Sequence, residues 1–423
     1  IIIVNDNDQS IAENHGGLYR NLAELRASNG TCERNVFRAM GLDYRYLDAG
    51  NDVLALVDAL QELRNIDHPI VLHVSTAKGK GFEPAQSDPE RWHHVGPFDM
   101  ATGRKLCPGH PSEPAPRTYA DITGEALSAA IERDPQVVGI TAATPYIMGF
   151  TPELRAAAGK QFVDVGIAEG HGVAMCAGMA QQGMVPVFAV YSSFLQRGYD
   201  MLLHDVALNH LHVVLGVDRA GLVGADGETH HGCFDPMYLS QVPGMTVLCP
   251  ASFAELRRML HRAVEEIDGP VAVRYPRGGQ GRYREDGGDG AFACLREGED
   301  AAILTYGILV NQALDAADLL AQKGIRVRVL KLNQICPLDS GAVKEALSGT
   351  ERLLVLEDCM ATGCVGQRIA AILAQERMEP RCLTLKNLGG RFAPQGTVDQ
   401  LYKAFGLDAR SVADSVEEML HEQ

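Results

Sequence analysis

One stretch of the chain, residues 162–232, carries ionisable side chains next to apolar runs of strand length. Two apolar runs of strand length, VPVFAV and HVVLGV, flank a segment whose apolar residues recur at helical spacing between Phe194 and Ala207. This order predicts a strand, a helix and a second strand, the unit that builds parallel sheets. Parallel sheets place their sites at the carboxyl ends of their strands. The candidate site residues are therefore Glu169, His171, Tyr191, Arg197, Arg219, Asp226, His230 and His231.

Glu169 lies between an apolar strand and the mostly apolar sequence HGVAMCAGMAQQG, which predicts that its carboxyl is buried or nearly so. A buried carboxyl resists ionisation and can share a proton with a ring nitrogen. A carboxylate that interacts with the positive end of a helix dipole explains the same position equally well. The residue types alone leave both interpretations open.

Three arginines, Arg197, Arg219 and Arg277, lie on separate predicted elements. Each could form a forked contact with a phosphate, and a surface salt bridge is the alternative for each one alone. Asp226 and His230 flank a glycine-rich loop. This pairing suits binding of a hydroxyl or carbonyl group and movement of a proton, although a histidine often has a structural role instead.

Oxygen-rich side chains, among them Asn7, follow the first apolar run, IIIV. They suit a hard cation such as Mg²⁺, which often keeps phosphate oxygens in its shell, but Asn and Asp also end strands because they stabilise turns. A later strand, in HPIVLHVSTAKGKGF, ends at Lys78 and Lys80, which suit either a phosphate or a solvated loop. His93 lies beside Trp92 in a proline-rich segment, predicted as a linker, and could fold back over a site.

Composition narrows the class of protein. The chain has 423 residues, 46% hydrophobic and 22% charged, which is typical of a soluble α/β protein of two or three domains. Its net charge of −16 argues against nucleic acid or an acidic membrane as partner. Ten scattered cysteines without a CxxC pair predict reduced thiols in the cytoplasm. We also expect sequence upstream, because the chain begins without Met inside an apolar run.

Seven longer sequences occur in a characteristic order along essentially the whole chain: IVNDNDQSIAEN, VLHVSTAKGKGFEPAQSDP, VGIAEGHGVAMCAGMA, YSSFLQRGYDMLLHDVAL, DRAGLVGADGETHHGCFD, AVRYPRG and APQGT. They closely resemble those of the 1-deoxy-D-xylulose-5-phosphate synthases, which are thiamine-diphosphate-dependent, transketolase-like enzymes. The resemblance implies a three-domain α/β fold with parallel or mostly parallel sheets flanked by helices, and an incomplete first domain. It also implies a cytoplasmic homodimer.

The same resemblance implies domain limits. Residues 1–117 would be the C-terminal part of the diphosphate-binding domain with a linker. Residues 118–285 would form the pyrimidine-binding domain, and residues 290–423 the C-terminal transketolase-like domain.

Individual roles follow from the resemblance. Asn7 matches a magnesium ligand, and Gln9 stands where a backbone carbonyl completes that shell. Glu169 matches the glutamate that contacts the aminopyrimidine ring. The implied catalytic residues are Glu169, His230, Asp226 and His93. The implied cofactor-binding residues are Glu169, Phe194, Ile167, Lys78 and Asn7. The implied substrate-binding residues are Tyr191, Arg197, Arg219, Arg277, Asp226 and His230.

The implied reaction uses thiamine diphosphate and Mg²⁺ to condense pyruvate with D-glyceraldehyde 3-phosphate, giving 1-deoxy-D-xylulose 5-phosphate and CO₂. The sequence departs from the family pattern at Gly170 and His231, where glutamine is usual, and in the short segment between His15 and Phe37. Two alternatives therefore remain. One is a synthase-like transketolase with another donor or acceptor. The other is a non-catalytic fragment or subunit that needs a partner.

Overall fold

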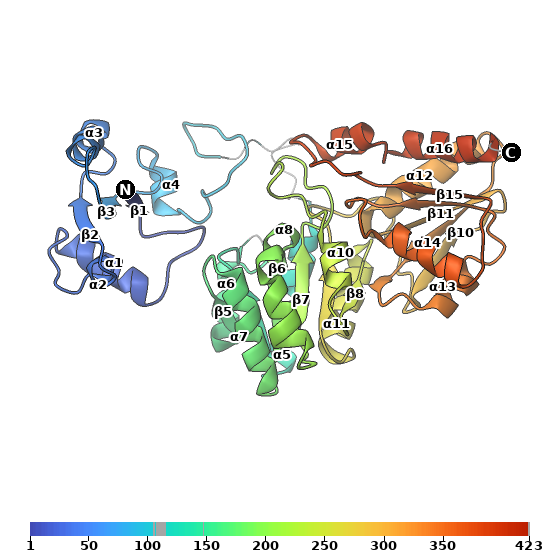
Figure 1. The fold of residues 1–423 in the computed structure, drawn as a ribbon, viewed down its shortest axis with the longest axis horizontal. Helices are drawn as coiled ribbons and strands as arrows, with labels where there is room; N and C mark the ends of the chain where they lie inside the picture. The colour runs from blue at the N-terminus through green and yellow to red at the C-terminus, as the bar shows by residue number, and fades with distance from the viewer. Residues whose placement is uncertain (105, 107–115, 147, 422–423) are drawn as a thin grey trace. The chain divides into compact units, whose positions relative to one another are not determined.

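The computed structural model describes residues 1–104, 106, 116–146 and 148–421. The chain divides into two compact units, Ile1–Ala115 and Pro116–Gln423 (Figure 1). Both units combine helices with parallel or mostly parallel sheets, which confirms the predicted fold class. Among the described residues, no helix has both the length and the apolar character needed to cross a bilayer.

The first unit contains a three-stranded parallel sheet of order β1-β3-β2. Asp6 of β1 pairs with Ser75 of β3, so these two strands end at the same edge of the sheet. The elements of this unit are β1 (Ile2–Asp6), α1 (Gly17–Ala27), α2 (Val36–Ala39), β2 (Asp43–Leu47), α3 (Val53–Glu62), β3 (Ile70–Ser75) and α4 (Glu83–Ser87).

Helix α3 begins at a capping residue, because the Asp52 side chain accepts hydrogen bonds from the amides of Leu54 and Ala55. The preceding sequence, DYRYL, forms the strand β2. Tyr46 of β2 packs edge-on against the fully buried His73 ring, with ring centroids 5.1 Å apart. Aromatic side chains that pack across neighbouring strands favour strand over helix here.

The second unit begins with a seven-stranded sheet of order β13-β8-β9-β7-β6-β4-β5. All neighbouring strands run parallel except β13 (Gln334–Cys336), which pairs antiparallel with β8. The other elements around this sheet are α5 (Tyr119–Arg133), β4 (Val137–Thr141), α6 (Pro152–Ala158), η1 (Gly159–Gln161), β5 (Phe162–Asp164), α7 (Glu169–Gln181), β6 (Val185–Tyr191), β7 (Val214–Asp218), α10 (Asp235–Ser240), β8 (Thr246–Leu248), α11 (Phe253–Glu265) and β9 (Val271–Arg274).

Strand β6 separates two hydrophobic cores because its side chains alternate between the two faces of the sheet. Phe188 and Val190 pack into the core that includes residues of α7. Val187, Ala189 and Tyr191 pack into the core that includes residues of α5 and α11. The apolar sequence VPVFAVY is therefore a strand buried on both faces, as expected in a parallel sheet covered by helices.

The segment after β6 was predicted as a single helix, and the structure divides it into four short pieces. These are α8 (Ser192–Leu195), the 3₁₀ turn η2 (Gln196–Gly198), α9 (Tyr199–Met201) and the π-helix η3 (Leu202–Ala207). A Cβ on Gly198 would lie 2.7 Å from Val173 Cγ2 of α7, so glycine permits the close approach of this segment to α7. The break leaves Phe194 and Arg197 on a short turn at the sheet edge.

A five-stranded sheet of order β10-β12-β11-β14-β15 completes the second unit, with only β10 antiparallel to its neighbour. The buried ion pair between Glu255 of α11 and Lys331 of β12, 2.8 Å long, joins it to the preceding part. The elements are β10 (Phe292–Arg296), β11 (Ala301–Tyr306), η4 (Gly307–Leu309), α12 (Val310–Ala321), β12 (Val327–Leu332), α13 (Ser340–Ala346), β14 (Arg352–Leu356), α14 (Val365–Gln375), β15 (Cys382–Lys386), α15 (Val398–Phe405) and α16 (Ala409–His421).

Candidate active site

The predicted site residues of the second unit follow the carboxyl ends of β5, β6, β7 and β9. Tyr191, the last residue of β6, pairs with Asp218, the last residue of β7, so these strands end level with each other. Glu169 follows β5, Arg219 follows β7 and Arg277 follows β9. The parallel sheet therefore brings together residues that are far apart in the sequence, as its topology requires.

Glu169 is the first residue of α7 and is only 3% exposed. Its Oε1 lies 3.5 Å from Nη1 of Arg197, whose side chain is 63% exposed. Both interpretations of the sequence describe this residue, because the carboxyl is buried and also lies at the positive end of a helix. Two residues before it, Ile167 exposes 61% of its surface, which leaves an apolar side chain beside the carboxyl position in the sequence.

Three aromatic rings form a cluster beside this carboxyl. Tyr191 and Phe194 stack with their centroids 4.9 Å apart and their planes 29° apart. The ring of His230 meets Phe194 edge-on at 5.2 Å, and the guanidinium of Arg197 lies 5.6 Å from the Phe194 centroid. Phe194 thus connects Glu169, through Arg197, with the loop that carries His230.

Arg219 is almost completely buried and is held by its neighbour Asp218. The Asp218 carboxylate accepts the Arg219 backbone N–H at 2.6 Å and forms an ion pair with the guanidinium. Arg219 has a left-handed backbone with φ 60°, uncommon for a residue with a side chain, and its guanidinium lies 4.1 Å from the Tyr191 centroid. Burial raises the pKa of Asp218, against the lowering effect of Arg219.

The Nε atom of Arg219 is buried and has no hydrogen-bond partner within the described residues. The carboxylate oxygen Asp226 Oδ2 lies 3.8 Å from this nitrogen. A buried donor without a partner is unfavourable unless a further group supplies the acceptor. This part of the site therefore suits an anionic or carbonyl oxygen.

Asp226 links two of the predicted arginines. Its Oδ2 lies 3.0 Å from Nη1 of Arg277, and the same nitrogen donates to the carbonyl of Val223 at 3.4 Å. Each of the three predicted arginines thus already has a carboxylate within 4 Å. The salt-bridge alternative describes all three, and a phosphate would bind beside existing ion pairs.

Asp218 is the residue at this edge that the sequence analysis missed. Its signal was present, since it stands directly between the apolar strand HVVLGV and Arg219. The structure also shows the surroundings of Gly170 and His231, the two positions that depart from the family pattern. A Cβ on Gly170 would lie 3.0 Å from Met201 Cε, and His231 is 5% exposed.

In the first unit, Asn7, Gln9 and Lys78 lie after the carboxyl ends of β1 and β3, and His93 lies near Lys78. Asn7 Oδ1 accepts a hydrogen bond from the Gln9 amide at 3.1 Å, and the Lys78 ammonium donates to the carbonyl of Ser10. Burial lowers the pKa of Lys78. Burial, and then the positive charge of Lys78, lower the pKa of His93.

The described residues contain no group of three or more His, Cys, Asp or Glu side chains arranged to hold a metal ion. A cation at the turn after β1 could meet Asn7 Oδ1, because the carboxylates of Asp6 and Asp8 beside it pair with Arg26. This donor set is typical of Mg²⁺ that is bound together with phosphate oxygens of a ligand.

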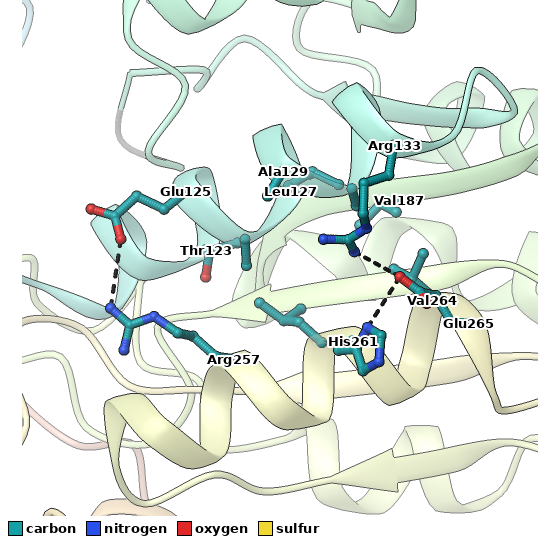
Figure 2. Close-up of a pocket in the computed structure, with 13 residues that line it drawn as sticks. Thr123, Glu125, Leu127, Ala129, Arg133, Val187, Arg257, His261, Val264 and Glu265 are labelled. Atoms are coloured by element: carbon teal, nitrogen blue, oxygen red, sulfur yellow. Dashed lines mark hydrogen bonds and ion pairs between the residues drawn. The ribbon is translucent and has the colours of Figure 1, made fainter.

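A separate pocket lies between α5 and α11 and has a volume of about 300 Å³ (Figure 2). Its apolar floor includes Val187 and Leu127, and ion pairs cross its rim between Arg133 and Glu265, at 2.7 Å, and between Arg257 and Glu125, at 3.6 Å. It contains none of the predicted site residues. We interpret it as a groove between two packed helices.

Comparison with known proteins assigns most of the second unit to two domain families. Residues 115–280 match the family model described as "Transketolase, pyrimidine binding domain". Residues 290–412 match the one described as "Transketolase, C-terminal domain".

Curated relatives extend the similarity over nearly the whole chain. The chain is 38% identical over 459 aligned residues to the 1-deoxy-D-xylulose-5-phosphate synthase of Chlorobium luteolum, covering 99% of this chain and 72% of that protein. It is 41% identical over 388 residues to the protein of that name from Chlorobaculum tepidum, covering 90% of this chain and 60% of the relative. A Geobacter sulfurreducens protein named 1-deoxy-D-xylulose-5-phosphate synthase 1 is 38% identical, with 99% and 71% coverage.

Among solved structures, a chain titled "Split gene transketolase, inactive beta4 tetramer" is similar with a TM-score of 0.62 and 26% identity. The match covers 72% of this chain and 98% of that one.

Proposed function

Since the chain belongs to the 1-deoxy-D-xylulose-5-phosphate synthase family of transketolase-like enzymes, we propose that it is a transferase that condenses pyruvate with D-glyceraldehyde 3-phosphate. The products are 1-deoxy-D-xylulose 5-phosphate, a precursor for isoprenoids, and CO₂. The reaction depends on thiamine diphosphate and Mg²⁺. The chain spans 60 to 72% of the lengths of the three relatives compared above.

One observation carries this proposal, namely the buried Glu169 carboxyl beside an aromatic ring cluster at a sheet edge. A carboxyl that is 3% exposed and close to Phe194 suits contact with a nitrogen heterocycle, because it can share a proton with a ring nitrogen while the aromatic ring packs on the heterocycle. These features fit the aminopyrimidine ring of thiamine diphosphate. When bound, the cofactor supplies the nucleophilic carbon and the electron sink.

In the second unit, Glu169 would orient the aminopyrimidine and share a proton with its ring nitrogen, while Phe194 and Ile167 would pack against the ring. Arg197 neutralises Glu169 and reaches solvent, where it can meet the acceptor. Arg219 and Arg277 bind the acceptor's phosphate, with Tyr191 supporting Arg219 by its ring face. Asp226 and His230 orient the hydroxyl and carbonyl groups of the substrate. They also transfer a proton to or from these groups.

In the first unit, Asn7 and the Gln9 carbonyl would hold Mg²⁺, and Lys78 would bind cofactor phosphate. The turn after β1 supports this role, since Arg26 already pairs with its Asp6 and Asp8 carboxylates and a diphosphate would supply negative charge to the cation. His93 donates or accepts a proton, and its lowered pKa supports a neutral imidazole near neutral pH.

We further propose the division into domains 1–117, 118–285 and 290–423, a homodimeric assembly and a cytoplasmic location. Ten scattered cysteines without a CxxC pair support a reducing compartment.

A second candidate function is that of a subunit that acts only with a partner chain. The split-gene transketolase favours this candidate, because the structural match covers 98% of that chain, which is described as an inactive tetramer. An assay of the purified chain alone and after addition of cell extract separates the two candidates.

Calorimetric titration of the chain with thiamine diphosphate, in the presence of Mg²⁺, tests the proposed cofactor site. We expect saturable binding to the wild type, with affinity weakened about 10-fold or more by Glu169→Ala, since a buried hydrogen bond to a charged group is lost. Equal affinity of both proteins would contradict the role of Glu169. Glu153→Ala, which changes an exposed glutamate on α6, is the matched control.

A further inference from the structure

The loop 221–232 carries Asp226 and His230, and its ends are joined by two reciprocal backbone hydrogen bonds. Gly221 donates to the Gly232 carbonyl at 2.7 Å, and Gly232 donates to the Gly221 carbonyl at 2.8 Å. Between these ends, the positions of Asp226 and His230 depend on how the loop is held to its surroundings. His231, which is 5% exposed, makes two of the contacts that hold it.

Both ring nitrogens of His231 are used. Nδ1 accepts a hydrogen bond from the Val223 backbone N–H at 3.2 Å, and Nε2 lies 3.1 Å from the carbonyl oxygen of Pro394. An amide N–H can only donate and a carbonyl can only accept, so the ring must be neutral and must carry its proton on Nε2. We call this pair of hydrogen bonds the His231 bridge. It connects two parts of the loop and ties them to a segment 163 residues further along the chain.

Other contacts also join the loop to residues 394–398. The Gln395 side chain donates to the Ala225 carbonyl at 3.4 Å. A Cβ on Gly224 would lie 3.0 Å from the Gly396 carbonyl oxygen, so the two backbones approach closely. Val223 is thus held through its backbone N–H by His231 and through its carbonyl by Arg277, which also pairs with Asp226.

We infer that His231 is a positioning residue for the Asp226–His230 loop, and that protonation of its ring releases the loop and weakens binding of the phosphorylated acceptor. This inference rests on the proposed function, because it assigns Asp226 and Arg277 to the acceptor site. A protonated imidazole has two N–H groups and no acceptor. The Val223 N–H would then face another donor inside the protein, and this arrangement cannot persist.

Charged groups of both signs lie near the His231 bridge. Asp226 and His230 lie on the loop itself, Arg219 and Arg277 lie on the flanking segments, and Asp358, just after β14, lies against Gly221. Arg277 donates to the Val223 carbonyl, so a proton on His231 would add a second positive charge beside the same residue. No carboxylate accepts from His231 in the described hydrogen bonds, because its Nε2 partner is the Pro394 carbonyl.

Glutamine at this position gives a decisive comparison. Its carbonyl can accept from Val223 and its amide can donate to Pro394, but it cannot take up a proton in the pH range in which histidine does. His231→Gln should therefore keep the loop ordered and remove its response to acid. His231→Ala should lose the bridge at every pH. His204→Gln, which changes an exposed histidine on η3, is the matched control.

The test is hydrogen–deuterium exchange of residues 222–231 at about pH 8 and about pH 5.5, a range in which histidine titrates. Variants are compared at the same pH, so that the intrinsic chemical rate cancels. We expect wild type and His231→Gln to exchange alike at pH 8. At pH 5.5 the wild type should exchange about 10-fold faster than His231→Gln. His231→Ala should exchange faster at both pH values, and His204→Gln should follow the wild type. Equal exchange of wild type and His231→Gln at pH 5.5 would overturn the inference.

The KM for D-glyceraldehyde 3-phosphate, compared with kcat, provides the functional readout. We expect acid to raise this KM more for the wild type than for His231→Gln, with kcat changing equally in both. Hydrogen–deuterium exchange does not require catalytic turnover. The role of His231 and the proposed function can therefore be contradicted independently of each other. Acid-dependent exchange in a chain that releases no CO₂ would overturn the proposed function alone. If His231→Gln does not fold, wild-type exchange decides: protection, corrected for the intrinsic rate, must fall with acid in residues 222–231 but not in β11.

Discussion

Asp226 and Arg277 form an ion pair of 3.0 Å, although they lie on different segments and Arg277 follows the strand β9. The same carboxylate lies 3.8 Å from Arg219. The proposed phosphate site is therefore arranged before any substrate arrives, because a carboxylate fixes the directions of both guanidinium groups. The first prediction tests this arrangement.

Arg277→Ala should raise the KM for D-glyceraldehyde 3-phosphate by about 10- to 100-fold, the value of one hydrogen bond to a charged group. The KM for pyruvate should change little. Steady-state kinetics with both substrates measures this, and Arg282→Ala is the control, since Arg282 is a half-exposed arginine that pairs with Asp315 and Asp318. If Arg277→Ala raised the KM for unphosphorylated glyceraldehyde by the same factor, phosphate binding by Arg277 would be contradicted.

Phe194→Leu should weaken thiamine diphosphate binding by about 2- to 10-fold, because the aromatic face is lost while most of the apolar volume remains. Calorimetric titration in the presence of Mg²⁺ measures the effect. Phe392→Leu changes a phenylalanine that is 73% exposed, and it should leave the affinity unchanged. Unchanged affinity in Phe194→Leu would remove this ring from the cofactor site.

Glu255→Ala should lower the free energy of unfolding by about 3 to 5 kcal/mol, because it leaves Lys331 buried without its counter-charge. Both side chains are fully buried, and Glu255 also accepts hydrogen bonds from Tyr283 and the Ala251 amide. Urea unfolding followed by circular dichroism measures the loss. Glu299→Ala removes an exposed partner of Arg326 and should cost less than about 1 kcal/mol; similar losses for both variants would show that burial of the pair is not decisive.

Asp408 should stabilise the terminal helix α16 in a pH-dependent manner. Its carboxylate accepts hydrogen bonds from the Ser411 hydroxyl at 2.6 Å and the Ser411 amide at 3.3 Å. Burial alone would raise the pKa of Asp408, but these hydrogen bonds outweigh it and hold the pKa below its usual value of 3.8. A carboxyl whose pKa is lowered by folding stabilises the protein above its unfolded pKa, and this contribution is lost as the pH falls through the folded value.

Asp408→Ala should therefore destabilise α16 by about 0.5 to 2 kcal/mol at neutral pH, and the difference from wild type should shrink below pH 3.8. Hydrogen exchange of the α16 amides measures it. Asp414→Ala, an exposed residue of the same helix, is the control. A difference that stays constant from neutral to acidic pH would contradict a role of the ionised carboxylate.

The sequence allowed good prediction of features that depend on local patterns. Apolar runs such as VPVFAV became strands at the expected positions. Burial of Glu169 also followed from its apolar neighbours. These properties depend on residues close in the chain, so spacing and residue type carry them.

Features that depend on distant contacts could not be predicted in the same way. The helical spacing after β6 did not reveal the π-helix η3 or the break near Gly198, because that break follows from contact with Val173 of α7. The stacking of Arg219 on Tyr191 and the bond from His231 to Pro394 each join separate elements. Residue types alone left open whether the three arginines form salt bridges or bind phosphate, and the structure shows the salt bridges in place.

The most direct test of the account is CO₂ release from pyruvate by the purified chain with thiamine diphosphate and Mg²⁺, with and without D-glyceraldehyde 3-phosphate. The account predicts release that increases when the aldehyde is added and that falls about 100-fold or more in Glu169→Gln, which keeps the shape of the side chain but removes its acid–base function. Release that is independent of the aldehyde, or undiminished in Glu169→Gln, would contradict it.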